Sequence, residues 1–503
     1  MNRYQTGFLS RLGGPSFLAG VVLTVCFAAY IPLPSLRGSY VASFLAYFLI
    51  AAAAYVLAVT RLDRDRLPLT GIWVFAILFR LILLGTDPTL SDDVYRYIWD
   101  GHLLNQGINP FSLPVNSPLL DQYDTLLRGL VNHDWMASPY LPVSQFYFAL
   151  VNRVLPQSIL AFQVGAVIFD LSTGWLVFDI LRMLGLSRNK ALIYLWNPLV
   201  IVEFAHGAHI DALMIFLMMA AFWFLVRSKP GQPGRDRECY FSAFALAGST
   251  LTKAIPALLV PLFVRRWGWR RLIVYFALLL SLSALFAAGA GWGLSGPLDG
   301  RGLFGALRIY SSYWNYNSGI YHWFEVLILG SQAAGATSGE IVGDTPVLFA
   351  KLFTIALTAL ISLASGVWAW KLDDPGKADF NLRSVYLLRL TAIPIGAYLL
   401  LTTTVHPWYV TLIVPLLPFL YPVQDETNLT GRFVWPWIYF SIAVTFSYLT
   451  YIDPQNLREY PLVRLLEYLP MYLLFIWASM PLFHHRLGRI FATGNLWDRI
   501  KRK

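Results

Sequence analysis

The amino-acid sequence predicts an all-α protein that crosses a membrane many times. Of its 503 residues, 57% are hydrophobic and only 13% are charged, and the mean hydropathy is +0.56, whereas soluble domains contain about 25% charged residues. Apolar stretches long enough to span a bilayer recur from one end of the chain to the other, separated by polar or basic loops. We therefore expect about 12–14 transmembrane helices, with loops and interfacial helices at the outer face.

Charge and cysteine content exclude other classes of protein. Lys and Arg (38) outnumber Asp and Glu (28), but the basic residues cluster in short loops between apolar stretches, which fits lipid head groups and not nucleic acid. Cys26 and Cys239 lie in or beside apolar stretches, so no disulfide framework is expected. The basic segment 1–14 leads into an apolar stretch without a small-residue cleavage site, so we expect no cleavable signal peptide.

The distribution of arginine and lysine assigns a side to each loop. Arg61 and Arg64 follow the second apolar stretch, so the positive-inside rule places the N-terminus and loop 61–67 in the cytoplasm. Loops 87–156 and 291–345 then lie outside, and both termini lie inside. We expect one membrane domain over 1–503 and no separate soluble domain. The predicted spans are 17–34, 41–60, 69–86, 157–182, 190–206, 211–227, 272–290, 346–370, 384–403, 407–421, 434–451 and 467–484.

The stretch 239–264 has two readings. A single span would place the arginines that follow it outside, whereas two short half-helices meeting around Thr252 and Lys253 would keep those arginines in the cytoplasm. We favour the half-helices, because short basic loops strongly prefer the cytoplasm. Lys253 would then lie at a helix break near the outer leaflet.

A polar segment, SDDVYRYIWDGHLLNQGINPF at 91–111, interrupts the apolar pattern after the third span. On a helix that Ser91 can cap, Asp92, Arg96 and Asp100 are four residues apart and share one face. One interpretation is an interfacial helix whose Asp92 and Arg96 neutralise each other. The other is a catalytic acid, which we favour because adjacent acids at a membrane face are costly and often functional.

Chemically useful side chains converge on the predicted outer face, although only Lys and Arg were used to assign the sides. They are Asp92, Asp93, His133, His209, Lys253, Asn315, Asn317 and His406. A carboxylate beside cations suits transfer of a sugar from a lipid phosphate to a hydroxyl. The carboxylate takes the proton of the attacking hydroxyl, the cations stabilise the departing phosphate, and direct displacement inverts the anomeric carbon.

Each of these groups also has a structural interpretation. Lys253, within LTKAIP, is either a phosphate ligand or a lysine that extends to the interface. His406, before Pro-Trp-Tyr, either donates to phosphate or belongs to an aromatic belt. His209 and Asp211 provide too few ligands for a metal site and can form a helix cap. The same choice, between stacking on sugars and anchoring in the interface, applies to the aromatic residues Tyr310, Tyr313, Trp314, Tyr316 and Trp323.

The string SDDVYRYIWDG…GINPF resembles the first outer-loop signature of bacterial GT-C glycosyltransferases, in particular polyprenyl-phosphate-mannose-dependent mannosyltransferases. Relatives tend to have a Tyr-Pro-Pro run in this loop, whereas this chain reads SPYLPVSQ at 138–145, which leaves the donor-sugar and acceptor contacts open. Further pieces follow in the family's order, namely Trp196-Asn197-Pro198, Glu203, His209-x-Asp211, LTK ending at Lys253, HPWY from His406, and Glu467-Tyr468-Leu469-Pro470.

This resemblance implies a GT-C-like fold and an inverting transferase at the outer face of the bacterial inner membrane. The donor would be a polyprenyl-phosphate sugar, mannose or another hexose, and the acceptor a lipid-linked or cell-envelope glycan. We expect Asp92 as the base and Asp93 as its partner, with no cofactor, no essential metal and no nucleic acid. Donor-phosphate residues would be Lys253, His406, Arg96, His209 and Tyr409. Substrate-positioning residues would be Asp100, Asp211, Tyr140, Asn315 and Asn317.

Other functions make different demands on the sequence. A transporter would show repeated halves and charged residues along a mid-membrane pathway, whereas here no repeat is evident and the notable polar groups gather at one face. A lipid-linked oligosaccharide ligase or polymerase shares the location and the lipid phosphate, and it stays open because the acceptor is not written in the sequence. A non-catalytic lipid-binding scaffold would tolerate loss of both Asp92 and Asp93.

Overall fold

The computed structural model describes residues 14–65, 67–230, 234–296, 298–329, 345–374, 376, 378–421 and 431–492; for residues 312, 328, 329, 345–348 and 482–492 it describes the backbone alone. In this part of the chain the regular structure is helical, and β pairing is confined to an isolated bridge between Tyr316 and Thr404. The all-α prediction is confirmed. Residues 330–344 of the second predicted outer loop and both chain ends lie outside the described residues.

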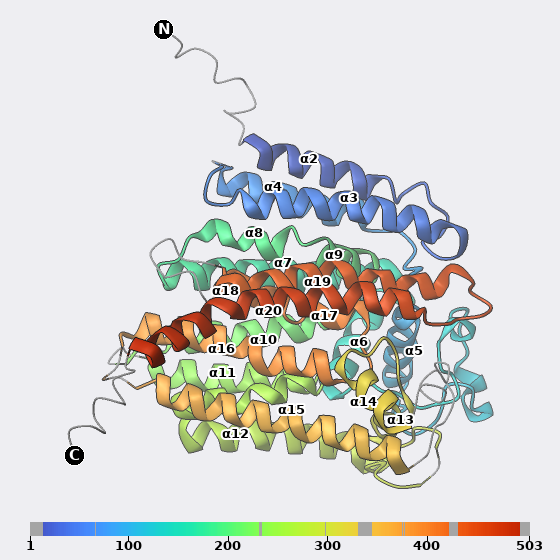
Figure 1. Cartoon of the computed structure of the whole chain (residues 1–503). Coiled ribbons are helices and arrows are strands. Elements are labelled where there is room, and N and C mark those ends of the chain that lie inside the picture. Colours follow the sequence, from blue (N-terminus) through green and yellow to red (C-terminus); the bar gives the residue numbers. More distant parts are fainter. Residues whose placement is uncertain are drawn as a thin grey trace.

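Three helices at the start of the chain form one edge of the molecule. They are α2 (Gly14–Ala28), α3 (Val41–Thr60) and α4 (Leu69–Leu83), which lie side by side at the top of Figure 1. α2 ends before the predicted boundary at residue 34. Pro32 and Pro34 explain the difference, because proline lacks the amide hydrogen and disfavours helix in the residue before it.

The middle of the bundle contains both continuous and composite helices. α8 ends at Leu195, and the side chain of Asn197 caps α9 by accepting from the backbone of Leu199 and Val200. The predicted span 190–206 is therefore built from short pieces that end in a π-helical turn. The elements are α7 (Ile159–Met183), η4 (Arg188–Ala191), α8 (Leu192–Leu195), α9 (Pro198–Ile201), η5 (Val202–His206), α10 (Asp211–Arg227) and α11 (Arg235–Thr250).

The remaining helices complete the bundle, with α12 and α15 on the side away from α2 and α19 and α20 across the middle (Figure 1). Their axes run nearly parallel to those of the earlier helices (Figure 1). The elements are η6 (Ile255–Leu259), α12 (Val260–Ala290), α15 (Thr345–Leu372), α16 (Phe380–Leu401), α17 (Pro407–Val410), η7 (Val414–Leu416), α18 (Leu417–Leu420), η8 (Gly431–Phe433), α19 (Val434–Ala443), η9 (Val444–Ile452) and α20 (Pro461–Ala492).

The chain breaks where the arginine argument predicted. α11 ends at Thr250, a turn carries Lys253, and helix resumes at Ile255. A second break occurs inside α12 at Gly268, whose φ of 66° is a backbone conformation that glycine adopts readily. The basic residues around Gly268 therefore lie at a turn between two helical segments, and the predicted break around Thr252 and Lys253 is confirmed.

The helices have the lengths and composition of a polytopic membrane protein. Among the described residues, seven helices are long and apolar enough to cross a membrane, and α2, α4 and Pro407–Leu420 are shorter apolar helices. The sequence predicted about 12–14 crossings. The additional predicted spans correspond to α10, to α11, to the composite segment 192–206 and to the division of α12 at Gly268. Each predicted span thus has a helical counterpart.

Charged residues also lie inside the bundle, where Arg80 on α4 meets Asp170 on α7. Both side chains are fully buried, and the guanidinium Nε lies 2.6 Å from the carboxylate. Tyr194 donates to Asp170, and Arg80 donates to the carbonyl of Leu195. The charged groups of Arg80 and Asp170 are therefore fully hydrogen-bonded within the protein, and these bonds join α4, α7 and α8. Such a paired arrangement is typical of a structural contact between helices.

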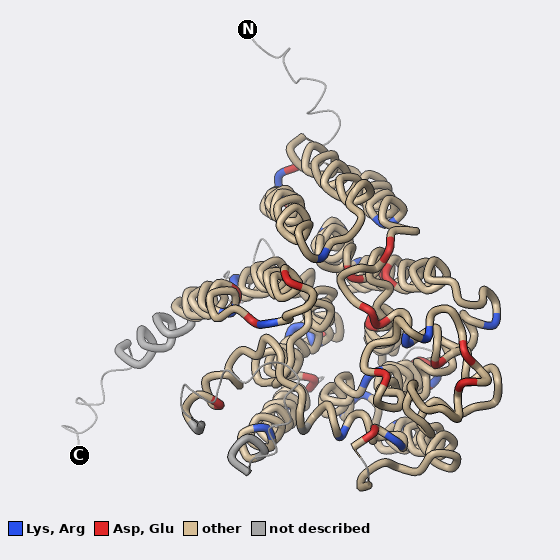
Figure 2. Tube along the Cα trace, turned by 90° about the vertical axis from the view of Figure 1, so that its right-hand side faces the viewer, with Lys and Arg blue, Asp and Glu red and all other residues tan. Residues whose placement is uncertain are grey.

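Short helices and loops cover one end of the bundle. Asp and Glu lie on several of these loops with Lys and Arg among them, as seen when this end faces the viewer (Figure 2). The acid-bearing segment forms α5, and a Cβ added to its Gly101 would collide with the carbonyl of Phe148 on α6. The glycine therefore lets the two helices approach closely. The elements of this end are η1 (Gly38–Tyr40), α5 (Asp93–Asn105), η2 (Pro118–Tyr123), η3 (Arg128–Leu130), α6 (Pro142–Val154), α13 (Gly305–Tyr313) and α14 (Ile320–Leu329).

Candidate active site

The adjacent carboxylates Asp92 and Asp93 face different surroundings. Asp92 pairs with Arg37, from the loop between α2 and α3, at 3.2 Å, and its side chain is 40% exposed. Asp93 is 16% exposed, accepts a hydrogen bond from Asn132 at 3.0 Å and lies 3.8 Å from Nδ1 of His209. Asp93 is thus the acid that faces the other chemically useful residues.

His209 lies beneath Asp93 in the turn between η5 and α10. Its ring is fully buried, and its Nε2 lies 3.2 Å from Oε2 of Glu203. Glu203 is 1% exposed, comes from the π-helical turn η5 and accepts a hydrogen bond from Tyr448 at 2.7 Å. Such π-helical turns occur frequently at functional sites, because the extra residue turns side chains out of the regular helical register.

Lys253 reaches the same region from the turn after α11. Its ammonium lies 2.6 Å from Oδ2 of the fully buried Asp211 and 5.2 Å from the ring centre of Tyr409. The phenol of Tyr409 is bonded to that of Tyr310 at 2.7 Å. Lys253 keeps 16% of its side chain exposed, so a phosphate can approach the ammonium from the open side.

Four stacked rings join His209 to the second outer loop. His209 stacks on Trp408 with 4.1 Å between ring centres, and Trp408 stacks on His406 at 4.4 Å. His406 stacks in turn on Tyr316 at 4.8 Å. Within the described residues, the His406 ring nitrogens make no hydrogen bond, and the residue is half-buried. The stack therefore holds His406 in place while its nitrogens stay available.

Electrostatics favour an ionised Asp93. Burial by itself would raise the pKa of its carboxyl, but His209, Lys253, the Asn132 hydrogen bond and His406 together lower the pKa below the ordinary value. Burial, opposed in part by Asp93, lowers the pKa of His406 to about 3. At neutral pH, Asp93 can therefore accept a proton, and His406 is a neutral hydrogen-bonding group.

Arg96 is not placed to bind a donor phosphate, which corrects the sequence-based prediction. It is 1% exposed and donates to the carbonyls of Asn132, His133 and Met136 at 2.9–3.2 Å. The residues four positions away on α5 are not its partners, because the 131–136 turn folds over the helix and captures the guanidinium. Arg96 holds in place the turn that carries Asn132.

Asp100 and Tyr140 lie below the site. Asp100 is 1% exposed, accepts hydrogen bonds from Ser138 and Gln145, and burial raises its pKa to about 6. Its contacts fasten the segment that departs from the family's Tyr-Pro-Pro pattern. Tyr140 lies close enough to Asp93 that burial and the carboxylate together raise its pKa. Tyr140 thus lies next to Asp93, whereas Asp100 is not in the site and instead holds Ser138 and Gln145 in place.

Asn315 and Asn317 are held by carboxylates outside the cluster around Asp93. Asn315 donates to both oxygens of Glu325 at 3.0 Å, and Asn317 donates to Glu467 at 2.6 Å. Asn317 also has a positive φ of 47° and is 3% exposed. These amides shape the second outer loop, and the prediction that they position substrate is not supported by their contacts.

The sequence of the chain matches an established family. A family model described as alpha-(1->6)-mannopyranosyltransferase, N-terminal domain, matches residues 16–269, just over half of the chain. The chain belongs to this family. The predicted resemblance to GT-C mannosyltransferases is thereby confirmed, and the matched region of this chain includes Asp93, Glu203, His209 and Lys253.

Curated relatives carry the same family description. Alpha-(1->6)-mannopyranosyltransferase A of Corynebacterium glutamicum is 27% identical over 143 residues, 27% of this chain and 28% of the relative. The protein of the same name from Mycobacterium tuberculosis is 24% identical over 257 residues, 44% of each chain. A probable alpha-(1->6)-mannopyranosyltransferase of Mycolicibacterium smegmatis is 27% identical over 184 residues, 34% of this chain and 31% of the relative. The match thus spans less than half of each relative. No solved structure matches this chain.

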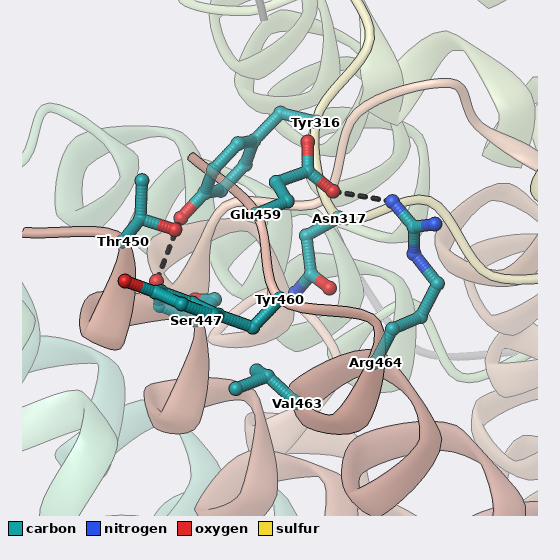
Figure 3. Close-up of a pocket in the computed structure, with 8 residues that line it drawn as sticks. All are labelled: Tyr316, Asn317, Ser447, Thr450, Glu459, Tyr460, Val463 and Arg464. Carbon is teal, nitrogen blue, oxygen red and sulfur yellow. Dashed lines mark hydrogen bonds and ion pairs between the residues drawn. The ribbon is translucent and has the colours of Figure 1, made fainter. Parts of the chain in front are cut away.

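A small cavity lies beside the ring stack, against Tyr316. It has a volume of about 10 Å³, roughly the space of one water molecule, so it is too small for a sugar ring. Glu459 and Arg464 pair across it, and Tyr316 donates to the carbonyl of Ser447 (Figure 3). The lining residues are Tyr316, Asn317, Ser447, Thr450, Glu459, Tyr460, Val463 and Arg464.

Several residues of this site were not identified from the sequence. Glu203 was noted only as a motif position, and Trp408, Tyr448, Asn132 and Arg37 were assigned no role. The π-helical turn that directs Glu203 inward follows an Asn-Pro break, which is a usable signal; the others depend on contacts between distant segments. Among the described residues, no three His, Cys, Asp or Glu side chains are arranged to hold a metal ion; the expectation about metals stays a prediction.

Proposed function

We propose that this protein is an inverting mannosyltransferase that moves mannose from a polyprenyl-phosphate donor to a hydroxyl of a lipid-linked or cell-envelope glycan. One observation carries the proposal: in a chain of the alpha-(1->6)-mannopyranosyltransferase family, segments far apart in sequence bring His209, Lys253 and His406 to the same carboxylate, Asp93. Asp93, and not Asp92, is assigned as the base, because Asp92 is paired with Arg37 away from these groups. The whole chain, 1–503, would form one such domain.

The reaction needs a base and a stabilised leaving group. Asp93 takes the proton of the acceptor hydroxyl while the hydroxyl oxygen attacks the anomeric carbon. The bond from that carbon to the phosphate oxygen breaks, and the electron pair leaves on the phosphate, where Lys253 stabilises the charge. His406 donates a hydrogen bond to the same phosphate from its ring. No protein nucleophile is required.

Direct displacement also dictates the donor configuration. The curated relatives are named for an alpha-(1->6) product. Because one displacement inverts the anomeric centre, an alpha product requires a donor with the mannose in the beta configuration. The phosphate is already a good leaving group, so the site needs no second carboxylate acting as an acid. This agrees with the surroundings of Asp93, which face it with imidazoles and an ammonium.

A panel of donors tests the proposal. Purified protein in lipid nanodiscs is offered beta- and alpha-linked polyprenyl-phosphate mannose, polyprenyl-phosphate glucose and a nucleoside-diphosphate mannose, with an alpha-mannoside acceptor. We expect mannose transfer from the beta-linked lipid donor alone, with a new alpha-(1->6) linkage seen by NMR. Use of the nucleotide donor, or a beta-linked product, would contradict the proposed reaction.

We also propose that the site lies on the outer face of a bacterial inner membrane and that both termini are cytoplasmic. Arg61 and Arg64 follow α3 at the end of the bundle opposite to α5. The positive-inside rule assigns the end that carries these arginines to the cytoplasm. In a variant without Cys26 and Cys239, we expect an impermeant maleimide to label Leu126→Cys in intact cells, since Leu126 is 96% exposed.

Asp63→Cys, in the exposed turn between α3 and α4, is the matched control for this labelling. It is expected to react only after the membrane is permeabilised. If Asp63→Cys reacts in intact cells and Leu126→Cys does not, the orientation is reversed and the proposed location of the site is wrong.

A further inference from the structure

A line of buried polar groups leads away from Asp93 into the bundle. Asp93 Oδ2 lies 3.8 Å from His209 Nδ1, and His209 Nε2 lies 3.2 Å from Glu203 Oε2. Tyr448 then donates to Glu203 Oε1 at 2.7 Å. The four groups come from α5, the turn after η5, η5 itself and η9, so the fold assembles the line from three distant parts of the chain.

The two central groups of this line, His209 and Glu203, are buried. His209 is fully buried and Glu203 is 1% exposed. Neither ring nitrogen of His209 makes a well-formed hydrogen bond in this structure, yet one nitrogen faces each carboxylate. Burying a carboxylate and an imidazole costs free energy unless they interact with each other. The polar neighbours of the two ring nitrogens are therefore two acids, one on each side of the ring.

We propose that Glu203 is a positioning residue that acts through His209 to reset the catalytic base Asp93 after each transfer. In this proposal the ring proton sits on Nε2, 3.2 Å from Glu203, which leaves Nδ1 unprotonated and directed at Asp93. The inference rests on the proposed function, because it needs Asp93 to be the base. It assigns a role to a second carboxylate that touches neither substrate.

The acceptor O–H bond breaks as the glycosidic bond forms, and its proton goes to Asp93. The proton then passes from the Asp93 carboxyl to Nδ1 of His209, and Glu203 stabilises the resulting imidazolium. When the polyprenyl phosphate leaves and water enters, the proton returns through Asp93 to the solvent, because His209 itself is fully buried. No oxidant or other reactant is consumed.

Other titratable and charged groups surround this line and set the baseline for any pH effect. Lys253 and His406 also lower the pKa of Asp93, and His206 lies close to His209. The titratable and charged groups around this line are Arg96, Tyr97, His133, Tyr140, Glu203, His206, Asp211, Lys253, Tyr310, His406, Tyr448 and Tyr451.

Glu203→Gln tests the role, because glutamine keeps the shape and still accepts from Tyr448. We expect kcat to fall on the order of 10- to 100-fold with little change in the donor KM. We also expect the acidic limb of the pH–kcat profile to move to higher pH. Asp93 must be ionised to act, and without the Glu203 charge its proton is harder to release.

Glu467→Gln is the matched control, since Glu467 is another fully buried carboxylate at the same end, bonded to Asn317. It is expected to leave the acidic limb in place. A Glu203→Gln protein with full kcat, or with lowered kcat and an unmoved limb, overturns the proposal. If Glu203→Gln does not fold, His209→Gln must move the limb in the same direction. Absence of transfer by the unmodified protein would instead refute the proposed function itself.

Discussion

The Asp93→Asn protein is expected to lose about 10²- to 10⁴-fold in kcat, the usual contribution of a general base. Asparagine keeps the shape and can still accept from Asn132, so the fold is retained while the proton acceptor is lost. The measurement is single-turnover transfer of labelled mannose from beta-linked polyprenyl-phosphate mannose, with donor binding followed separately. We expect binding to change far less than turnover.

Asp92→Asn provides the comparison, because the two acids are neighbours in sequence. Asp92 is 40% exposed and paired with Arg37, and exposed ion pairs contribute only about 0–1 kcal/mol. The Asp92→Asn protein should keep its kcat within roughly threefold of the unmodified protein. If Asp92→Asn loses turnover and Asp93→Asn retains it, Asp92 is the base and not Asp93. If both variants retain turnover, neither of these two residues is the base.

Lys253→Met is expected to lower the free energy of unfolding by about 3–5 kcal/mol and to abolish transfer. The ammonium lies 2.6 Å from Oδ2 of Asp211, which is fully buried, and Oδ1 of the same carboxylate has no hydrogen-bond partner among the described residues. Removing the lysine therefore leaves a buried charge without compensation. Thermal unfolding in detergent and the transfer assay measure the two effects.

A double variant separates these two roles of the lysine. Lys253→Met with Asp211→Asn has no buried charge at this position, so most of the stability should return. Donor binding should stay weak, because the phosphate still lacks its cation. Wild-type donor affinity in the double variant would show that Lys253 serves the fold alone. Unchanged stability in the single variant would show that Asp211 is not charged when Lys253 is absent.

Apolar length and arginine placement predicted the fold well, because both report on the bilayer and not on side-chain packing. The break at Thr252 and Lys253 is the clearest case. Hydropathy alone allowed a single span over 239–264, but that span would have placed the arginines around Gly268 outside, so their charge predicted a break in the helix. The same side assignment brought His209, Lys253 and His406 to one end of the molecule.

The choice between Asp92 and Asp93 could not be made from sequence. It depends on Arg37, which reaches Asp92 from the loop between α2 and α3, and on the rotation of α5 that the close approach at Gly101 fixes. Helical spacing likewise suggested an ion pair for Arg96, but backbone carbonyls of a later turn took its hydrogens. Such outcomes are decided by tertiary contacts between segments that no local pattern links.

Tyr316, His406, Trp408 and His209 form a continuous pile of flat rings. Separating one ring from the next by even an ångström forfeits much of their dispersion attraction, so the pile shifts as a block. Backbone bonds from Tyr316 to Thr403 and Val405 tie the same segments together. The loop surface at Tyr316, which an incoming glycan would contact, and the His209 ring next to the base therefore move as one rigid unit. Any opening of the site must come from a hinge outside these four residues.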